Sequence, residues 1–136
     1  MEIILAENHG FCYGVKRAVE MANEAADSDG KSYTLGPIIH NPQVVGRLES
    51  KGVSPIQEVS DIDEGTMIIR SHGVGPAIYE EAEEKGLNIL DATCPHVKKA
   101  QQDAKSVIED GMTLVILGEK NHPEVKSINL WANNKG

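Results

Sequence analysis

One unit recurs along the 136-residue chain: a short apolar strand, a loop with a reactive side chain, and a helix. The apolar runs at 3–6, 33–35, 66–70, 87–90 and 113–117 are the candidate strands of these units. Several of the helices are opened by proline, which suits the first helical position because no amide hydrogen bond is lost there. Short strands without polar faces, alternating with helices, predict an α/β fold with a mostly parallel sheet flanked by helices.

Helix starts are marked in places by their capping residues. Asn41 is a residue type that caps helices well, and Pro42 after it suits the first helical position. Pro95 likewise opens a helix, whose apolar residues between 97 and 108 fall on one side. The single tryptophan, Trp131, lies in the run 128–131, which is a candidate further strand. A packing role suits this side chain better than the stacking of a cofactor.

Composition excludes several classes of partner. A net charge of −8 and a pI near 5.0 leave no basic surface for nucleic acid. No apolar run approaches the roughly 20 residues that cross a membrane as a helix. The N-terminus also lacks the basic segment of a signal peptide. Two widely separated cysteines indicate a reducing compartment rather than a disulfide framework. We therefore expect a cytoplasmic protein without nucleic-acid or membrane partners.

Reactive side chains follow the predicted strands. In open parallel sheets, ligands bind beyond the carboxyl ends of the strands, so residues in these loops are candidates for one site. A single loop histidine is usually a surface residue, and a single cysteine is as often buried and structural as reactive. Six such residues at one predicted edge are harder to explain in this way. They are Cys12, His40, His72, Cys94, His122 and Glu124.

The residue types in this set narrow the chemistry. Structural zinc sites normally take their cysteines in close pairs, and here each cysteine stands alone, as suits a metal or cluster assembled from separate loops. A thiol at a helix N-terminus, where Cys12 is expected, loses its proton more easily. Histidines can donate hydrogen bonds to an anion, and a carboxyl group two residues after His122 can carry a proton. The set suits reductive chemistry on a phosphorylated substrate.

Five short motifs occur in a fixed order. They are Gly10-Phe11-Cys12-Tyr13-Gly14-Val15, Ile39-His40-Asn41, Ser71-His72-Gly73-Val74, Asp91-Ala92-Thr93-Cys94-Pro95 and Asn121-His122-Pro123-Glu124-Val125. Together they resemble the IspH/LytB family, the hydroxymethylbutenyl diphosphate reductases. The resemblance extends over essentially all 136 residues but covers less than half of that family's usual catalytic chain.

This resemblance implies the last step of the non-mevalonate isoprenoid pathway. There, two electrons and protons remove an allylic hydroxyl to give isopentenyl and dimethylallyl diphosphates, with ferredoxin or flavodoxin as the kind of electron donor. It implies that Cys12 and Cys94 are ligands of a 4Fe-4S cluster, whose third cysteine ligand is absent from this chain. It also implies that Glu124 is the catalytic proton donor. The implied diphosphate-binding residues are His40, His72 and His122.

The resemblance further implies a three-lobed, pseudo-symmetric α/β enzyme. On that plan, residues 1–95 are the first α/β lobe and residues 96–136 are the beginning of an incomplete second lobe. We therefore expect a truncated form that is inactive alone. His9 and His96 match no ligand position and are expected to face solvent. The alternative is a small non-catalytic anion-binding α/β module with structural cysteines, which explains the missing cysteine better but leaves the five motifs unexplained.

Overall fold

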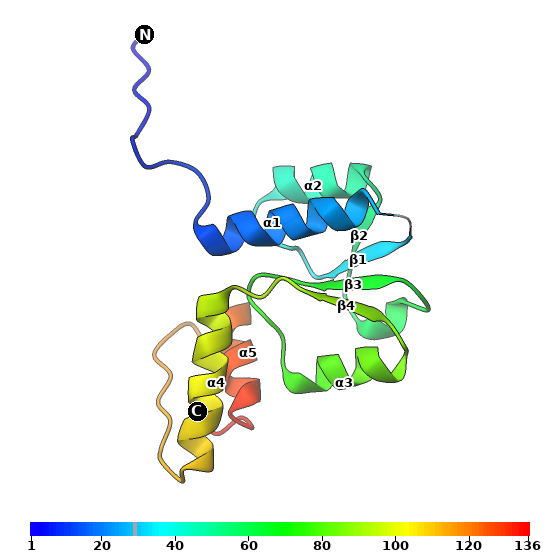
Figure 1. Cartoon of the computed structure of the whole chain (residues 1–136). Helices are drawn as coiled ribbons and strands as arrows, with labels where there is room; N and C mark the ends of the chain where they lie inside the picture. The colour runs from blue at the N-terminus through cyan, green and yellow to red at the C-terminus, as the bar shows by residue number, and fades with distance from the viewer. Residues whose placement is uncertain (29) are drawn as a thin grey trace.

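A computed structural model describes residues 1–28 and 30–136 and shows a four-stranded parallel sheet in the order β2–β1–β3–β4. Helices cover both faces: α1 and α2 lie on one side of the sheet and α3 on the other (Figure 1). The strands are β1 (Ser32–Leu35), β2 (Val53–Ile56), β3 (Thr66–Ile69) and β4 (Asn88–Asp91). The helices are α1 (Tyr13–Ala26), α2 (Pro42–Ser50), α3 (Pro76–Glu84), α4 (Pro95–Glu109) and α5 (Pro123–Trp131). The predicted α/β fold with a parallel sheet is confirmed.

Two hydrophobic cores, one on each face, hold the sheet between its helices. Successive residues of β3 alternate between them: Ile68 packs with α1 and α2, while Met67 and Ile69 pack on the opposite side near α3. All three are fully buried. Burying a side chain of this size is worth roughly 1.5–3 kcal/mol. The continuous apolar run at 66–69 is therefore explained by burial on both faces of the strand.

The predicted helix starts are also present. The side chain of Asn41 accepts a hydrogen bond from the Val44 amide at 3.1 Å, and α2 begins at Pro42. Pro95 opens α4 in the same way. The run 128–131 is helical rather than a further strand, and Trp131 donates its indole hydrogen to the Val74 carbonyl at 2.9 Å. Trp131 thus has the expected packing role, holding α5 against the loop before α3.

One strand and one short helix were not predicted. β2 contains Pro55, which the sequence analysis did not read as part of a strand. Proline has no backbone N–H to donate to a neighbouring strand. It is tolerated in an edge strand, which has a neighbour on one side only, and β2 is the edge of this sheet. A 3₁₀-helix, Val59–Asp61, follows it. β2 is the edge of the sheet opposite β4, and the 3₁₀-helix packs against α3.

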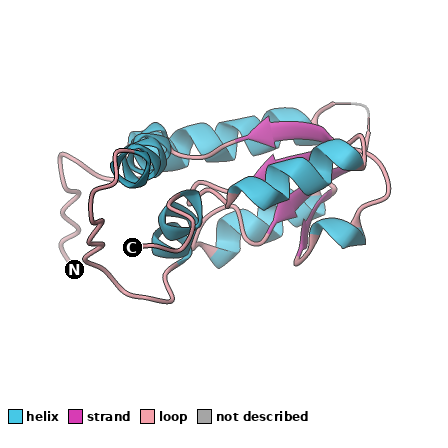
Figure 2. Cartoon of the chain, turned by 90° about the horizontal axis from the view of Figure 1, so that it is seen from below, coloured by secondary structure: helices cyan, strands magenta, loops and turns pink. Residues whose placement is uncertain are grey.

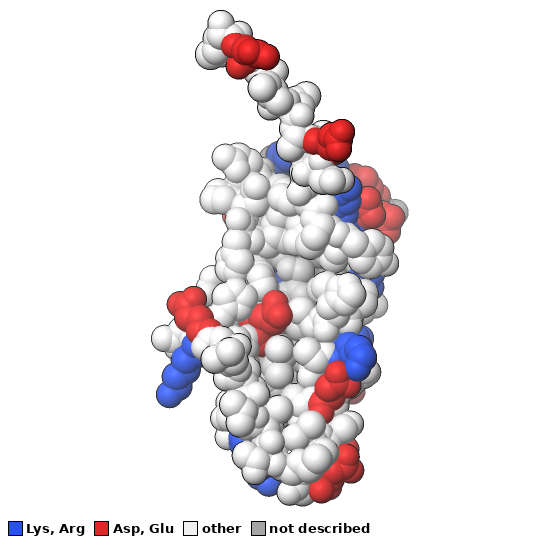
Figure 3. Space-filling view, turned by 90° about the vertical axis from the view of Figure 1, so that its left-hand side faces the viewer, with Lys and Arg blue, Asp and Glu red and all other residues white. Residues whose placement is uncertain are grey.

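The two predicted strands at 3–6 and 113–117 are wrong. Neither segment is in a strand, and apolar side chains in them are exposed, Ile4 by 82% and Val115 by 83%. The N-terminal segment stands away from the body of the molecule, with acidic side chains along it (Figure 3). A strand needs a neighbour to satisfy its backbone hydrogen bonds. Within the described residues, neither segment has one. Cys12 therefore follows an extended tail, not a strand.

Helices α4 and α5 pack against each other beyond the carboxyl ends of the strands (Figure 1). Figure 2 shows the strands between their covering helices, with both chain termini toward this same end of the molecule. The loops after β1 and β3 are directed toward α4 and α5. Within the described residues, no helix is both long enough and apolar enough to cross a membrane. The division of the chain at residue 95 into two lobes stays a prediction.

Candidate functional site

Two histidines meet where the order of the strands reverses. β1 has β2 on one side and β3 on the other, so the loops after β1 and β3 leave the sheet next to each other. Such a switch point opens a crevice in α/β sheets. His40 lies in the first loop and His72 in the second, and their ring centroids are 4.5 Å apart. The sheet topology thus explains the contact between residues that are far apart in the sequence.

A third histidine comes from outside the sheet. His122 is the N-cap residue of α5, and its ring centroid lies 6.1 Å from that of His40 and 5.7 Å from that of His72. One ring nitrogen of each histidine lies within 4.8 Å of those of the other two. The expected convergence of the three histidines is present, and that they line a binding crevice stays a prediction. The packing of α5 against α4 and the loop before α3 produces the convergence.

His72 is the least solvated member of this cluster. Its Nδ1 is buried and has no hydrogen-bond partner among the described residues. Burial lowers the pKa of His72 to about 4, and the positive charges of His40, Arg70 and His122 act in the same direction. His72 is therefore neutral at neutral pH while the crevice holds no anion. A bound anion would supply negative charge, which would offset the positive charges around His72.

The hydrogen bond at His122 indicates which of its nitrogens can donate. The Glu124 amide donates to His122 Nδ1 at 3.3 Å. In the neutral ring the proton is then on Nε2, which makes that nitrogen a donor. Three imidazoles this close could also hold a divalent transition metal, which requires free acceptor nitrogens. The Nε2 proton of His122 favours the binding of an anion over that of a metal.

A buried polar chain supports the cluster from behind, and the sequence analysis missed it. Gln101 Nε2 donates to Ser127 Oγ at 2.7 Å, and Ser127 Oγ donates to the His72 carbonyl at 3.1 Å. The chain joins α4, α5 and the loop that carries His72. One signal could have revealed it: Gln101 is a polar residue on the apolar side of α4, between Val97 and Ala104.

The two cysteines occupy equivalent positions at the starts of α1 and α4. Cys12 is the N-cap residue of α1 and is exposed, while Cys94 is the N-cap residue of α4 and is half-buried. The start of α1 lies directly against Cys94, because a Cβ atom added to Gly14 would be 2.5 Å from the Cys94 sulfur. Both thiols therefore lie near helix N-termini.

Arg17 ties the two cysteine-bearing segments together. From α1 it donates to the carbonyls of Thr93 at 3.2 Å and Asp91 at 3.3 Å, just before Cys94. The Asp91 side chain accepts hydrogen bonds from Lys98 and from the Thr93 amide. Burial opposes its charge, but these bonds prevail and lower the pKa of Asp91. The sequence analysis did not single out Arg17 or assign a role to Asp91.

Asp91 also affects Tyr79, which donates its hydroxyl to that carboxylate at 3.2 Å. Burial, with the nearby Asp91 charge, raises the pKa of Tyr79 to about 12. Both groups therefore keep one protonation state near neutral pH and serve to shape the loop.

The remaining predicted residues lie at the margin of the site. Glu124 is in the first turn of α5 and half-buried, but its carboxylate is not part of the group of histidine nitrogens within 4.8 Å. His9 and His96 are exposed, as expected. The structure thus assembles two groups at one edge: three histidines, and two cysteine-bearing helix starts. The links between them are short, since the Cys94 amide donates to the carbonyl of Ser71, next to His72.

Comparison with known proteins gives the family of this chain. The family model described as LytB protein matches residues 3–136. The chain belongs to the LytB family. Membership accounts for the parallel sheet and for the five motifs at its carboxyl edge. It also means that the cysteines and histidines can be compared with those of longer relatives.

Relatives of known name belong to the same family. The chain is 55% identical over 135 residues to a 4-hydroxy-3-methylbut-2-enyl diphosphate reductase of Geotalea uraniireducens, covering 99% of this chain and 48% of that one. A solved structure of (E)-4-hydroxy-3-methyl-but-2-enyl diphosphate reductase, described as the terminal enzyme of the non-mevalonate pathway, matches with a TM-score of 0.84. It is 49% identical and covers 97% of this chain and 47% of that one.

A reductase structure from Plasmodium falciparum is more distant in sequence. Its TM-score is 0.90 at 33% identity, and the match covers 95% of this chain and 41% of that one. The chain therefore spans about half the length of the relatives that it matches. A 4Fe-4S cluster is usually held by cysteine thiolates at each iron. This chain has two cysteines, so Cys12 and Cys94 do not by themselves provide the ligands of a complete cluster.

Proposed function

We propose that this chain provides the diphosphate-binding and cysteine-bearing part of a 4-hydroxy-3-methylbut-2-enyl diphosphate reductase. The observation that carries the proposal is the convergence of His40, His72 and His122, whose ring nitrogens lie within 4.8 Å of one another. The 55% identity to a named reductase supports it. The proposed substrate is hydroxymethylbutenyl diphosphate, which loses its allylic hydroxyl to give isopentenyl and dimethylallyl diphosphates. The proposed setting is the cytoplasm, with ferredoxin or flavodoxin as the electron donor.

The histidines suit a diphosphate because they offer hydrogen-bond donors and because repulsion between their positive charges would be relieved by an anion. His122 presents an Nε2 proton, and His72 is neutral in the empty crevice because burial and neighbouring charges lower its pKa to about 4. An anion relieves the repulsion among the rings and favours the charged imidazoles. Charge-assisted hydrogen bonds to phosphate oxygens are about twice as strong as neutral ones. The crevice is therefore predisposed to bind a highly charged anion.

The other proposed roles follow the same plan. Glu124 would supply the proton with which the hydroxyl leaves as water, and its position in the first turn of α5 places it two residues from His122. Cys12 and Cys94 would be thiolate ligands of a 4Fe-4S cluster, which supplies electrons when bound. Both cysteines begin helices, so their side chains lie at the same kind of position on two neighbouring segments. Further ligands would have to come from outside these 136 residues.

Titration of the chain with hydroxymethylbutenyl diphosphate in metal-free buffer tests the substrate site. We expect saturable binding, and His40→Asn should weaken it by roughly tenfold or more, the scale of one charge-assisted hydrogen bond. His40 is exposed, so its replacement should leave the fold intact. The matched control is His96→Asn, which removes an exposed histidine outside the crevice.

Two results of this titration would count against the proposal. Equal affinities of the parent chain, His40→Asn and His96→Asn would exclude the histidine crevice as the binding site. Binding of methyl phosphate as tight as that of the allylic diphosphate would favour the alternative, a general anion-binding module. That outcome would agree with the clustered histidines but not with a diphosphate-specific role.

A further inference from the structure

A second groove lies beside the histidine crevice, between the loop after β3 and helix α5. It encloses about 320 Å³, and its walls include Gly36, Gln57, Gly73 and Ser127. Two of its lining residues are cations, Arg70 and Lys126. No aspartate or glutamate is among the lining residues. The groove is thus a positively charged hollow on the surface of a protein whose net charge is −8.

Arg70 is the unusual residue in this groove. Its side chain is half-buried, and its Nε is buried without a hydrogen-bond partner among the described residues. No carboxylate in the described ranges, 1–28 and 30–136, forms an ion pair with it. Burial lowers the pKa of Arg70. A buried guanidinium without an anionic partner destabilises the folded state, because the cost of removing it from water is not offset by an ion pair.

The backbone holds this cation inside the groove rather than letting it extend into solvent. Nη1 of Arg70 lies against Gly36, where an added Cβ atom would come within 2.6 Å of it. Gly36 has φ +70, a conformation that favours glycine. A larger residue at position 36 would therefore displace the guanidinium. The geometry thus keeps the planar guanidinium, a group rich in N–H donors, at the wall of the groove.

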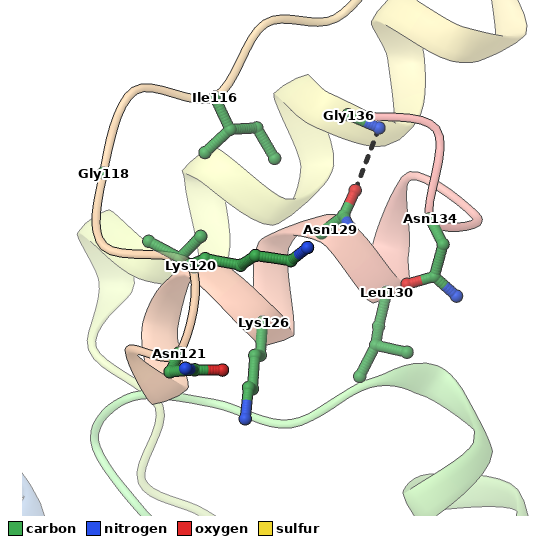
Figure 4. A pocket seen from close by; sticks show the side chains of 10 residues that line it. Ile116, Gly118, Lys120, Asn121, Lys126, Asn129, Leu130, Asn134 and Gly136 are labelled. Carbon is green, nitrogen blue, oxygen red and sulfur yellow. Dashed lines mark hydrogen bonds between the residues drawn. The ribbon is translucent and has the colours of Figure 1, made fainter.

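Lys126 supplies the second charge from the opposite wall. Figure 4 shows its side chain pointing away from Lys120 and toward the segment that precedes α3. Lys126 is exposed, and within the described parts of the chain no carboxylate pairs with its ammonium group. A flexible ammonium facing a fixed guanidinium is an arrangement that binds phosphate. The guanidinium can donate hydrogen bonds to two phosphate oxygens at once, and the ammonium acts as a point charge.

We propose that Arg70 and Lys126 form a second anion site, next to the histidine crevice, that binds the phosphate group of a small phosphorylated molecule. The three histidines are not among the lining residues of this groove, so the groove is a site distinct from the histidine cluster. Arg70 and His72 are two residues apart in the sequence, and after burial and His40 the charge of Arg70 also lowers the pKa of His72. An anion on Arg70 would remove part of that repulsion. The inference does not rest on the proposed reductase function.

Inorganic phosphate is the probe for this site. Amide chemical shifts of the isotope-labelled chain should move at Gly36, Gly73 and Ser127 with one saturation curve. Arg70→Gln should weaken phosphate binding by about tenfold or more, the scale of charge-assisted hydrogen bonds. Arg47→Gln, which removes an exposed arginine on α2, is the matched control and should change nothing. His40→Asn should leave this binding within about twofold of the parent value.

Thermal unfolding gives an independent reading. Phosphate should raise the Tm of the parent chain and of Arg47→Gln, because it binds only the folded state. Phosphate should not raise the Tm of Arg70→Gln. In phosphate-free buffer, Arg70→Gln should unfold at no lower temperature than the parent chain, since the substitution removes an unpaired cation. A destabilised Arg70→Gln with an unchanged phosphate response would overturn the proposal.

Other outcomes separate this site from the histidines. If phosphate shifts only amides near His40, His72 and His122, and the effect disappears in His40→Asn, the groove is not a site. If phosphate does not bind while the allylic diphosphate still does, this inference fails and the proposed function stands. If phosphate binds the groove and the allylic diphosphate does not bind, this inference stands and the proposed function fails.

Discussion

At the scale of single residues, His72 is a titratable side chain that is half-buried next to positively charged groups, and both conditions oppose its protonation. Its pKa of about 4 in the empty crevice lies below the value of about 6.5 expected in the unfolded chain. The folded state therefore binds this proton less readily than the unfolded state. The associated stability is fully present above about pH 6.5 and is lost as the pH falls toward 4.

We predict that diphosphate binding is coupled to proton uptake at this residue. The bound anion favours the imidazolium, so the pKa of His72 rises on binding and a proton enters between about pH 4 and 6.5. Diphosphate affinity should accordingly increase as the pH is lowered through this range. Calorimetry in two buffers with different heats of ionisation measures the number of protons taken up.

His72→Asn is the comparison for this measurement. It keeps a polar side chain but cannot titrate, so its proton uptake should be smaller by the part that belongs to His72. Protonation of the ligand itself contributes equally to both proteins. The same uptake in parent and variant would assign the coupling to another group.

At the scale of elements, the decisive contact joins α1 to the segment before α4. Gly14 lies against the sulfur of Cys94, and Arg17 holds the carbonyls of Asp91 and Thr93. Because Cys12 begins α1, this contact fixes the position of one cysteine relative to the other. We regard Gly14 and Arg17 as positioning residues for the pair of cysteines.

Arg17→Ala should loosen this contact. We expect a loss of stability of roughly 1–3 kcal/mol, the scale for hydrogen bonds made by a charged group. Alkylation of Cys94 by iodoacetamide should also become faster, while Cys12, already exposed, should react at an unchanged rate and serve as an internal reference. Peptide mapping by mass spectrometry measures both rates in one sample.

Lys16→Ala is the control for this experiment, since Lys16 is exposed on the same helix. Gly14→Ala gives a second test, because its new Cβ atom would collide with the Cys94 sulfur and force one segment to move. If neither Arg17→Ala nor Gly14→Ala changes the relative reactivity of the two thiols, the contact does not position them.

At the scale of the whole molecule, the proposed cluster ligands in this chain are too few for a complete cluster. The chain has two cysteines, and its apolar segments 3–6 and 113–117 lie exposed without strand partners among the described residues. Two thiolates would leave two irons of a 4Fe-4S cluster without protein ligands. Such a centre would be open to water and oxygen.

We therefore predict that the 136-residue chain folds its sheet, retains no intact cluster and reduces no substrate. Anaerobic reconstitution with iron and sulfide, followed by gel filtration, should return a nearly colourless protein. Turnover assays with a strong reductant should give no isopentenyl diphosphate. A stable brown protein with reductase activity would show that the cluster forms here by pooling cysteines between chains.

Much of this architecture could be predicted from local signals. Asn41 and Pro42 mark the start of α2, and the run 66–69 indicates a strand buried on both faces. His40 and His72 follow neighbouring strands, so their approach could be expected from the sheet class. These signals act within a few residues of the chain, through capping, the fixed φ of proline and the spacing of apolar side chains.

What only the tertiary structure decided depends on contacts between distant residues. The run 113–117 has a strand-like sequence but no strand partner in residues 1–28 and 30–136, and β2 forms despite Pro55 because it lies at the edge of the sheet. Arg17 and Arg70 are both half-buried arginines, yet one finds two carbonyls and the other finds no partner in the described structure. Burial and pairing are properties of the assembled fold. The sequence by itself determined the α/β class and the residues at its reactive edge, whereas their solvation and their partners were set by long-range packing.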